Sequence, residues 1–251
     1  APSDHIIIDE EEFTNNINTA LTAASQNEWL ITLGIIPTRP DTGYGYIQYN
    51  DAIRDPNNQN MRKVKTFTEK PNLELAEKFL ASGDFLWNSG IFIWSLKTIT
   101  KAFETYLDDI NDLFKEGIGL YNTEKEKSFI NDIYTSCRKI SIDYGIMEKA
   151  TNVYVLSADF KWSDLGTWGS LYDTRKKDEN NNAVVGNDVL LYDTTNCIIN
   201  MPAGKLVVLQ GLDDYIIVED SNALLICRKS DEQEIRRFVS DIKNKKGENF
   251  I

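Results

Sequence analysis

The chain has 251 residues, of which 41% are hydrophobic and 11% aromatic, so it can bury a globular core and does not have the composition of a disordered chain. Its 27 basic and 39 acidic residues give a net charge of −12, which disfavours binding to nucleic acid or anionic membranes. No apolar run approaches the roughly 20 residues that a membrane helix needs. Three widely spaced cysteines without a CxxC pair, and no visible signal peptide, favour a reducing cytoplasm and disfavour a zinc site.

The first part of the chain alternates helical and strand patterns. Apolar residues at helical spacing predict a helix over 11–25, and the continuous apolar run 29–36 predicts a buried strand. This order indicates an α/β layer with a parallel sheet. A turn over 42–46 leads into a short strand, further strands are predicted at 61–68, 85–95 and 153–157, and helices are predicted at 73–81, 97–114 and 124–138.

The composition changes after the polar run 176–182, which indicates a linker or a wide turn. Short apolar segments then recur at regular intervals and predict an all-β unit, either a small barrel or a short β-helix. A helix is expected over 231–242. We therefore expect two domains, 1–178 and 179–251.

Asp4 and Asp164 are candidate metal ligands. Mg²⁺ commonly takes one or two protein carboxylates together with substrate phosphates and water. Asp4 follows Pro2-Ser3, and Asp164 lies between Trp162 and Trp168. Each aspartate could instead cap a helix or a turn.

Lys70, in Glu69-Lys70-Pro71 at the end of a predicted strand, is a candidate phosphate ligand. Pro71 biases Lys70 toward an extended backbone. The alternative is an ordinary surface pair between Glu69 and Lys70.

Asn88-Ser89-Gly90 interrupts an aromatic strand, which indicates a bulge or a close approach of a ligand to the backbone. Asn88 offers a donor and an acceptor to sugar hydroxyls. Gly45 could present its N–H to a ligand, or it could be an ordinary turn glycine. Asp143, in a predicted helix that begins at Ser141, could face the same site or simply favour the helix dipole.

Together these segments resemble the bacterial mannose-1-phosphate guanylyltransferases. The resemblance covers nearly the whole chain, and SIDYGIMEK (141–149) followed by WSDLGTW (162–168) is its most specific part. The other matching segments are 2–5, 34–38, 42–47, 67–71 and 87–92. It implies a Rossmann-like nucleotidyltransferase domain followed by a small left-handed β-helix domain.

The resemblance also implies roles for single residues. Mg²⁺ would be held by Asp4 and Asp164, and Lys70 would hold the sugar phosphate, so these three residues form the expected catalytic set. The expected substrate contacts are Gly45, Glu69, Lys70, Asn88 and Asp143. The implied reaction transfers GMP from GTP to mannose 1-phosphate and releases pyrophosphate.

The family's Gly-rich nucleotide loop is not found in these 251 residues, so we expect an N-terminally truncated chain that is inactive alone. A non-catalytic sugar-phosphate-binding or assembly module, and a sister enzyme for another sugar 1-phosphate, are alternative hypotheses. A sheet edge left uncovered near Ala1 would recruit other chains, and we therefore expect a homo-oligomer.

Overall fold

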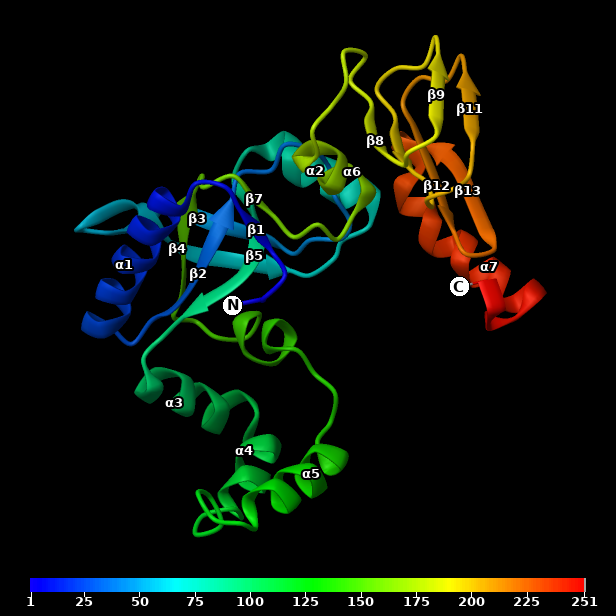
Figure 1. Ribbon diagram of the computed structural model, residues 1–251. Coiled ribbons are helices and arrows are strands. Elements are labelled where there is room, and N and C mark those ends of the chain that lie inside the picture. Colours follow the sequence, from blue (N-terminus) through cyan, green and yellow to red (C-terminus); the bar gives the residue numbers. More distant parts are fainter. Residues whose placement is uncertain (251) are drawn as a thin grey trace. The chain divides into compact units, whose positions relative to one another are not determined.

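The computed structural model describes residues 1–250, which form two compact units (Figure 1). Residues 1–3 and 7–162 form the first unit, and residues 4–6 and those from 163 onward form the second. The first unit contains β2 (Leu30–Ile35), β3 (Tyr46–Asp55), β4 (Asn58–Thr68), β5 (Phe85–Ile93) and β6 (Val153–Ala158). Its helices are α1 (Glu10–Gln26), α2 (Leu73–Ser82), α3 (Leu96–Tyr106), α4 (Asp108–Lys115), α5 (Glu126–Ser136) and the π-helical turn η1 (Asp143–Met147).

The strands of the first unit are arranged in the order β2-β5-β3-β4-β6, and β6 pairs back with β2 to close the sheet. Only the β2–β6 pair in this sheet is parallel, so the expectation of a parallel sheet is wrong. For β3 and β4 the difference arises because they are joined by a tight turn, in which the Asn57 N–H bonds the Asp55 carboxylate at 2.9 Å. A connection this short can join antiparallel neighbours only.

Both faces of this sheet are covered by helices, as expected for an α/β fold. Side chains from α1 and α2 pack on one face, and side chains from α3 and η1 pack on the other. Figure 1 shows α1 beside the strands and α3 below them. Every residue of β2 is buried, which accounts for its continuous apolar sequence.

The second unit is built mainly of short parallel strands. β8, β10 and β12 form one parallel row and β9 and β11 form another, so successive turns of chain stack in register. This stacking makes the unit a β-helix, one of the two architectures predicted; its left-handed sense stays a prediction. The strands are β8 (Ala183–Val185), β9 (Val189–Tyr192), β10 (Ile198–Asn200), β11 (Val207–Gln210), β12 (Tyr215–Asp220) and β13 (Ala223–Arg228).

Helical segments close the second unit. Trp168 and Leu171 of α6 (Trp168–Thr174) pack with Ile198 and Ile216 of the β-helix, and so does Ile235 at the start of α7. This contact explains why the compact units divide near residue 163, whereas the sequence suggested a domain boundary at 178. The remaining elements are η2 (Lys229–Glu234), α7 (Ile235–Lys246) and η3 (Glu248–Phe250), and the two-stranded ladder of β1 (Ile6–Ile7) with β7 (Trp162–Ser163).

The polar run before the β-helix is a turn with a buried anchor. Asn182 is fully buried, and its Oδ1 accepts the Cys197 N–H at 2.9 Å while its Nδ2 donates to the Thr194 carbonyl at 2.9 Å. These bonds join two coils of the β-helix. Across residues 1–250, none of the helices combines the length and apolar composition that a bilayer crossing requires.

The double-sided burial of β2 predicts a strong dependence of stability on its side chains. Leu33 is completely buried, and Leu33→Ala should lower the free energy of unfolding by about 2–5 kcal/mol because it leaves a cavity. Leu96 is 81% exposed, and Leu96→Ala should cost less than about 0.5 kcal/mol. Equilibrium urea unfolding followed by circular dichroism compares the two; equal midpoints would contradict this account of the core.

Candidate functional site

Three of the predicted residues meet where β3, β4 and β5 lie side by side. A Cβ added to Gly45 would lie 2.3 Å from Oε2 of Glu69 and 3.3 Å from Cβ of Asn88. The Asn88 N–H also donates to the Gly45 carbonyl at 2.8 Å. Only glycine at position 45 allows the Glu69 carboxylate to approach the backbone this closely.

The predicted bulge in β5 is confirmed. Gly34 of β2 pairs with Asn88, whereas Thr32 pairs with Phe92, so β5 carries extra residues at this point. Gly90 lies within the bulge and has φ +71°, which glycine adopts without strain.

The bulge fixes the amide of Asn88. Its Oδ1 accepts the Thr32 hydroxyl at 3.2 Å and the Gly90 N–H at 3.1 Å, and its Nδ2 donates to Oδ1 of Asp143 at 2.9 Å. The amide is therefore held from both ends, and Asp143 is brought to the same place from η1. Asp143, whose position the sequence left open, lies beside Asn88.

Lys70 lies at the same site with a backbone that differs from expectation. Its φ is +48°, in the left-handed region, so the prediction of an extended backbone before Pro71 is wrong. The turn lets the Lys70 N–H donate to the Tyr44 carbonyl at 3.2 Å, which accounts for the departure. The Lys70 Nζ lies 3.0 Å from Oε1 of Glu69; Lys70 is 53% exposed and Glu69 is 11% exposed.

A surface pocket joins these side chains to the segment that precedes η1. The ammonium group of Lys70 stands at this opening among carboxylates and hydroxyls, which is a polar lining suited to an anionic, hydroxyl-rich ligand. The lining residues are Glu69, Lys70, Lys139, Ile140, Ser141, Asp143 and Tyr144.

Glu148 is a residue of this site that the sequence did not single out. The residue is exposed overall, but its carboxyl group is partly buried, and this burial is the main cause that raises the pKa of Glu148. The negative charges of Glu69 and Asp143 raise the pKa further, whereas a hydrogen bond from the Glu69 N–H lowers it. It lies within the 141–149 segment that carried the resemblance. Nothing in the spacing of that segment indicates that its carboxylate faces Glu69.

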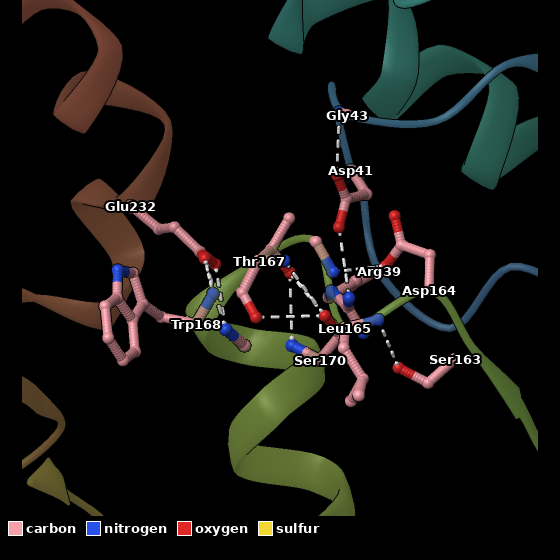
Figure 2. Close-up of polar contacts among 12 residues, drawn as sticks. Arg39, Asp41, Gly43, Ser163, Asp164, Leu165, Thr167, Trp168, Ser170 and Glu232 are labelled. Atoms are coloured by element: carbon pink, nitrogen blue, oxygen red, sulfur yellow. Dashed lines mark hydrogen bonds and ion pairs between the residues drawn. The ribbon is translucent and has the colours of Figure 1, made fainter. Parts of the chain in front are cut away.

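The loop that precedes Gly45 is held by a buried carboxylate. Asp41 is 1% exposed, its Oδ2 pairs with Arg39 at 3.0 Å, and its Oδ1 accepts the Gly43 N–H at 2.8 Å (Figure 2). The Asp41 N–H donates to the Tyr46 hydroxyl at 2.9 Å. Burial, as the main cause, raises the pKa of the Tyr46 hydroxyl above its ordinary value.

The two predicted metal ligands both belong to the second unit. Asp4 is exposed, and Asp164 lies in the loop after β7, where its Oδ1 accepts the Gly166 N–H at 2.8 Å. Asp164 does not cap α6, because Thr167 does so, with its side chain accepting from Ser170 N–H at 3.1 Å. The helix-capping alternative is therefore wrong for Asp164, whose carboxylate instead caps the turn at Gly166.

The carboxylates of Asp4 and Asp164 suit a hard divalent cation whose other ligands are water and substrate oxygens. Two carboxylates are enough for Mg²⁺ in such a site. Within residues 1–250 there is no group of three or more His, Cys, Asp or Glu side chains arranged to hold a metal. A site of this kind would have to be completed by phosphate oxygens.

Two family models match the chain. Residues 1–181 match the nucleotidyl transferase model, and residues 186–242 match the model of the mannose-phosphate isomerase/GMP-like β-helix domain.

Relatives that match most of the chain are named for one activity or for a pathway. Mannose-1-phosphate guanylyltransferases from Escherichia coli and Salmonella montevideo are 33% and 35% identical over 96% of this chain, covering 52% and 51% of the relatives. The alginate biosynthesis protein AlgA of Pseudomonas aeruginosa is 33% identical over 96% of the chain and 49% of the relative. The chain thus spans about half the length of the curated relatives it matches.

Two solved structures are similar in fold. The crystal structure of mannose-1-phosphate geranyltransferase from Thermus thermophilus matches 96% of this chain and 68% of that chain, with a TM-score of 0.78 and 29% identity. Mannose-6-phosphate isomerase from Helicobacter pylori matches 65% of this chain and 62% of that chain, with a TM-score of 0.55 and 25% identity.

The raised pKa of Glu148 predicts a pH-dependent stability. An acid whose pKa rises on folding stabilises the folded protein when the pH is below the ordinary pKa of 4.5. This stabilisation is lost as the pH rises through the pKa of the folded state. Glu148→Gln should therefore raise the melting temperature relative to the original chain near pH 7 and lose this advantage near about pH 4.

Melting curves across this pH range measure the effect. Glu77→Gln, at an exposed position of α2, removes the same charge away from the site and serves as the control. A Glu148→Gln difference that does not change with pH would contradict the assignment.

Proposed function

The chain belongs to the nucleotidyl transferase family, and we propose that it carries the sugar-phosphate and metal side of a mannose-1-phosphate guanylyltransferase. The proposed reaction joins mannose 1-phosphate and GTP to give GDP-mannose and pyrophosphate. The observation that carries the proposal is the convergence of Gly45, Glu69, Lys70 and Asn88 with Asp143 on one face of the first unit.

Each of these groups suits one part of a sugar phosphate. The half-exposed ammonium of Lys70 supplies a compact positive charge for the phosphate. The carboxylates of Glu69 and Asp143 can accept hydrogen bonds from hydroxyl groups, and three hydrogen bonds hold the Asn88 amide in one orientation. The bare backbone at Gly45 admits a ligand close to its N–H.

The chemistry needs positioning and charge neutralisation more than proton transfer. A phosphate oxygen of mannose 1-phosphate attacks the α-phosphorus of GTP, and the bond to the β-phosphate oxygen breaks to release pyrophosphate. A sugar phosphate is already an anion, so no protein base is required. Lys70 would reduce the repulsion between the two phosphate groups as they approach.

Asp4 and Asp164 are the residues that would hold Mg²⁺. When bound, the ion would neutralise negative charge on the substrate phosphates, which the acidic protein would otherwise repel. A homo-oligomeric state and a cytoplasmic location complete the proposal.

Titration calorimetry of the chain with sugar phosphates tests the binding site. Mannose 1-phosphate should bind about tenfold or more tightly than glucose 1-phosphate, and Lys70→Ala and Asn88→Ala should each weaken binding about tenfold or more. Lys78 forms a comparable exposed pair with Glu74 at 2.7 Å, and Lys78→Ala should leave binding unchanged. Equal effects of Lys70→Ala and Lys78→Ala would overturn the assignment.

Gly45→Ala separates binding from folding. The added methyl group meets Oε2 of Glu69 at 2.3 Å and Cβ of Asn88 at 3.3 Å, so the Glu69 carboxylate must move and Asn88 must shift slightly. We expect a loss of mannose 1-phosphate affinity of about tenfold with a melting temperature within a few degrees of the original. Calorimetry and thermal unfolding measure the two effects; unchanged affinity would show that the Gly45 approach plays no part in binding.

A further inference from the structure

The loop that carries Asp164 has a defined internal geometry. The Leu165 N–H donates to the Ser163 hydroxyl at 3.2 Å, and Leu165 has φ +54° in the left-handed region. The Gly166 N–H holds one oxygen of Asp164, and a Cβ at Gly166 would lie 2.6 Å from the other. The position of the carboxylate therefore depends on where the backbone of residues 165–167 lies.

The far end of this loop is the start of α6, which is capped twice. Thr167 and Ser170 bond each other's backbone N–H groups at 3.1 Å and form a capping box. The remaining N–H groups of the first turn, those of Trp168 and Gly169, are bound by the carboxylate of Glu232 (Figure 2). Both oxygens of Glu232 lie 3.2 Å from the Gly169 nitrogen.

Glu232 reaches this helix from a distant part of the sequence. It lies in η2, the segment that follows the last β-helix strand and leads into α7. A carboxylate is the favoured partner for the N–H groups at the start of a helix, because it complements their partial positive charge. The end of the β-helix thus holds the first turn of α6, and through Thr167 it limits where the Asp164 loop can lie.

We propose that Glu232 is a positioning residue for Asp164. Its carboxylate anchors the end of the loop, so the β-helix unit determines the geometry of a ligand for the divalent cation. The inference rests on the proposed function, because it takes Asp164 as a metal ligand. It assigns the closing segment of the β-helix a part in cation binding.

Mn²⁺ binding to the full chain, measured by electron paramagnetic resonance, tests the inference. Asp164→Asn should lose the site, and Glu232→Ala should weaken Mn²⁺ binding about tenfold, the lower end of the effects of residues that support metal ligands. Glu232→Gln should bind Mn²⁺ nearly as well as the original chain, because its amide oxygen can still accept the N–H groups.

The matched control is Glu234, in the same segment, which pairs with Arg237 at 2.8 Å. Glu234→Ala should leave Mn²⁺ binding unchanged. If Glu232→Ala fails to fold, Glu232→Asp keeps the charge but shortens the side chain, and it should weaken Mn²⁺ binding in the same direction. Original affinity in a folded Glu232→Ala or Glu232→Asp variant would overturn the inference.

Failure of the proposed function gives a different result. If Asp164→Asn binds Mn²⁺ as the original chain does, the metal assignment is wrong, and the positioning role is then decided by amide hydrogen exchange at Gly166. Faster exchange in Glu232→Ala than in Glu234→Ala would support the anchoring of the loop by Glu232. Equal exchange in the two variants would overturn it.

Discussion

The bulge in β5 is the constraint on which the candidate site depends. By adding residues between the pairing positions of Asn88 and Phe92, it places Asn88 Oδ1 within reach of Thr32 and Gly90. The other end of the amide is then free to bond Asp143. A regular strand would turn alternate side chains to opposite faces and could not present Asn88, Ser89 and Gly90 in this way.

In the second unit, the Asp164 side chain is also held in one position, but by a loop rather than by a bulge. A short loop orients Asp164 through the Gly166 N–H, and a carboxylate from the end of the β-helix holds the helix that follows. In both units the chemically interesting side chain is fixed by hydrogen bonds rather than by packing alone: Asn88 bonds two side chains and one backbone N–H, and Asp164 accepts a backbone N–H. Such bonds restrict a side chain to one orientation, which a binding site requires before its ligand arrives.

Local sequence patterns predicted much of this molecule. Apolar periodicity located α1, which buries one stripe, a continuous apolar run located β2, which buries both faces, and the polar interruption at Asn88 predicted the bulge. The patterns failed where the outcome depends on distant partners. The left-handed backbone of Lys70 depends on the carbonyl of Tyr44, and strand direction depends on which strands become neighbours.

Residues that act through long-range contacts gave no local signal either. Glu148 belongs to a segment chosen for its resemblance, yet its closeness to Glu69 is a property of the fold. Glu232 lies in an acidic, polar stretch that looks like ordinary surface, and only the structure shows that it caps α6.

The closure of the first sheet by β6 has a consequence for how the protein is made. Leu30 pairs with Val153, so β2 and β4 keep an open edge until nearly the whole first unit has left the ribosome. Contacts this distant in sequence form late and slow the search for the native state. During synthesis these unpaired edges are exposed to other nascent chains. Protection by chaperones at that stage would therefore matter more for this protein than for one in which paired strands follow each other in the sequence.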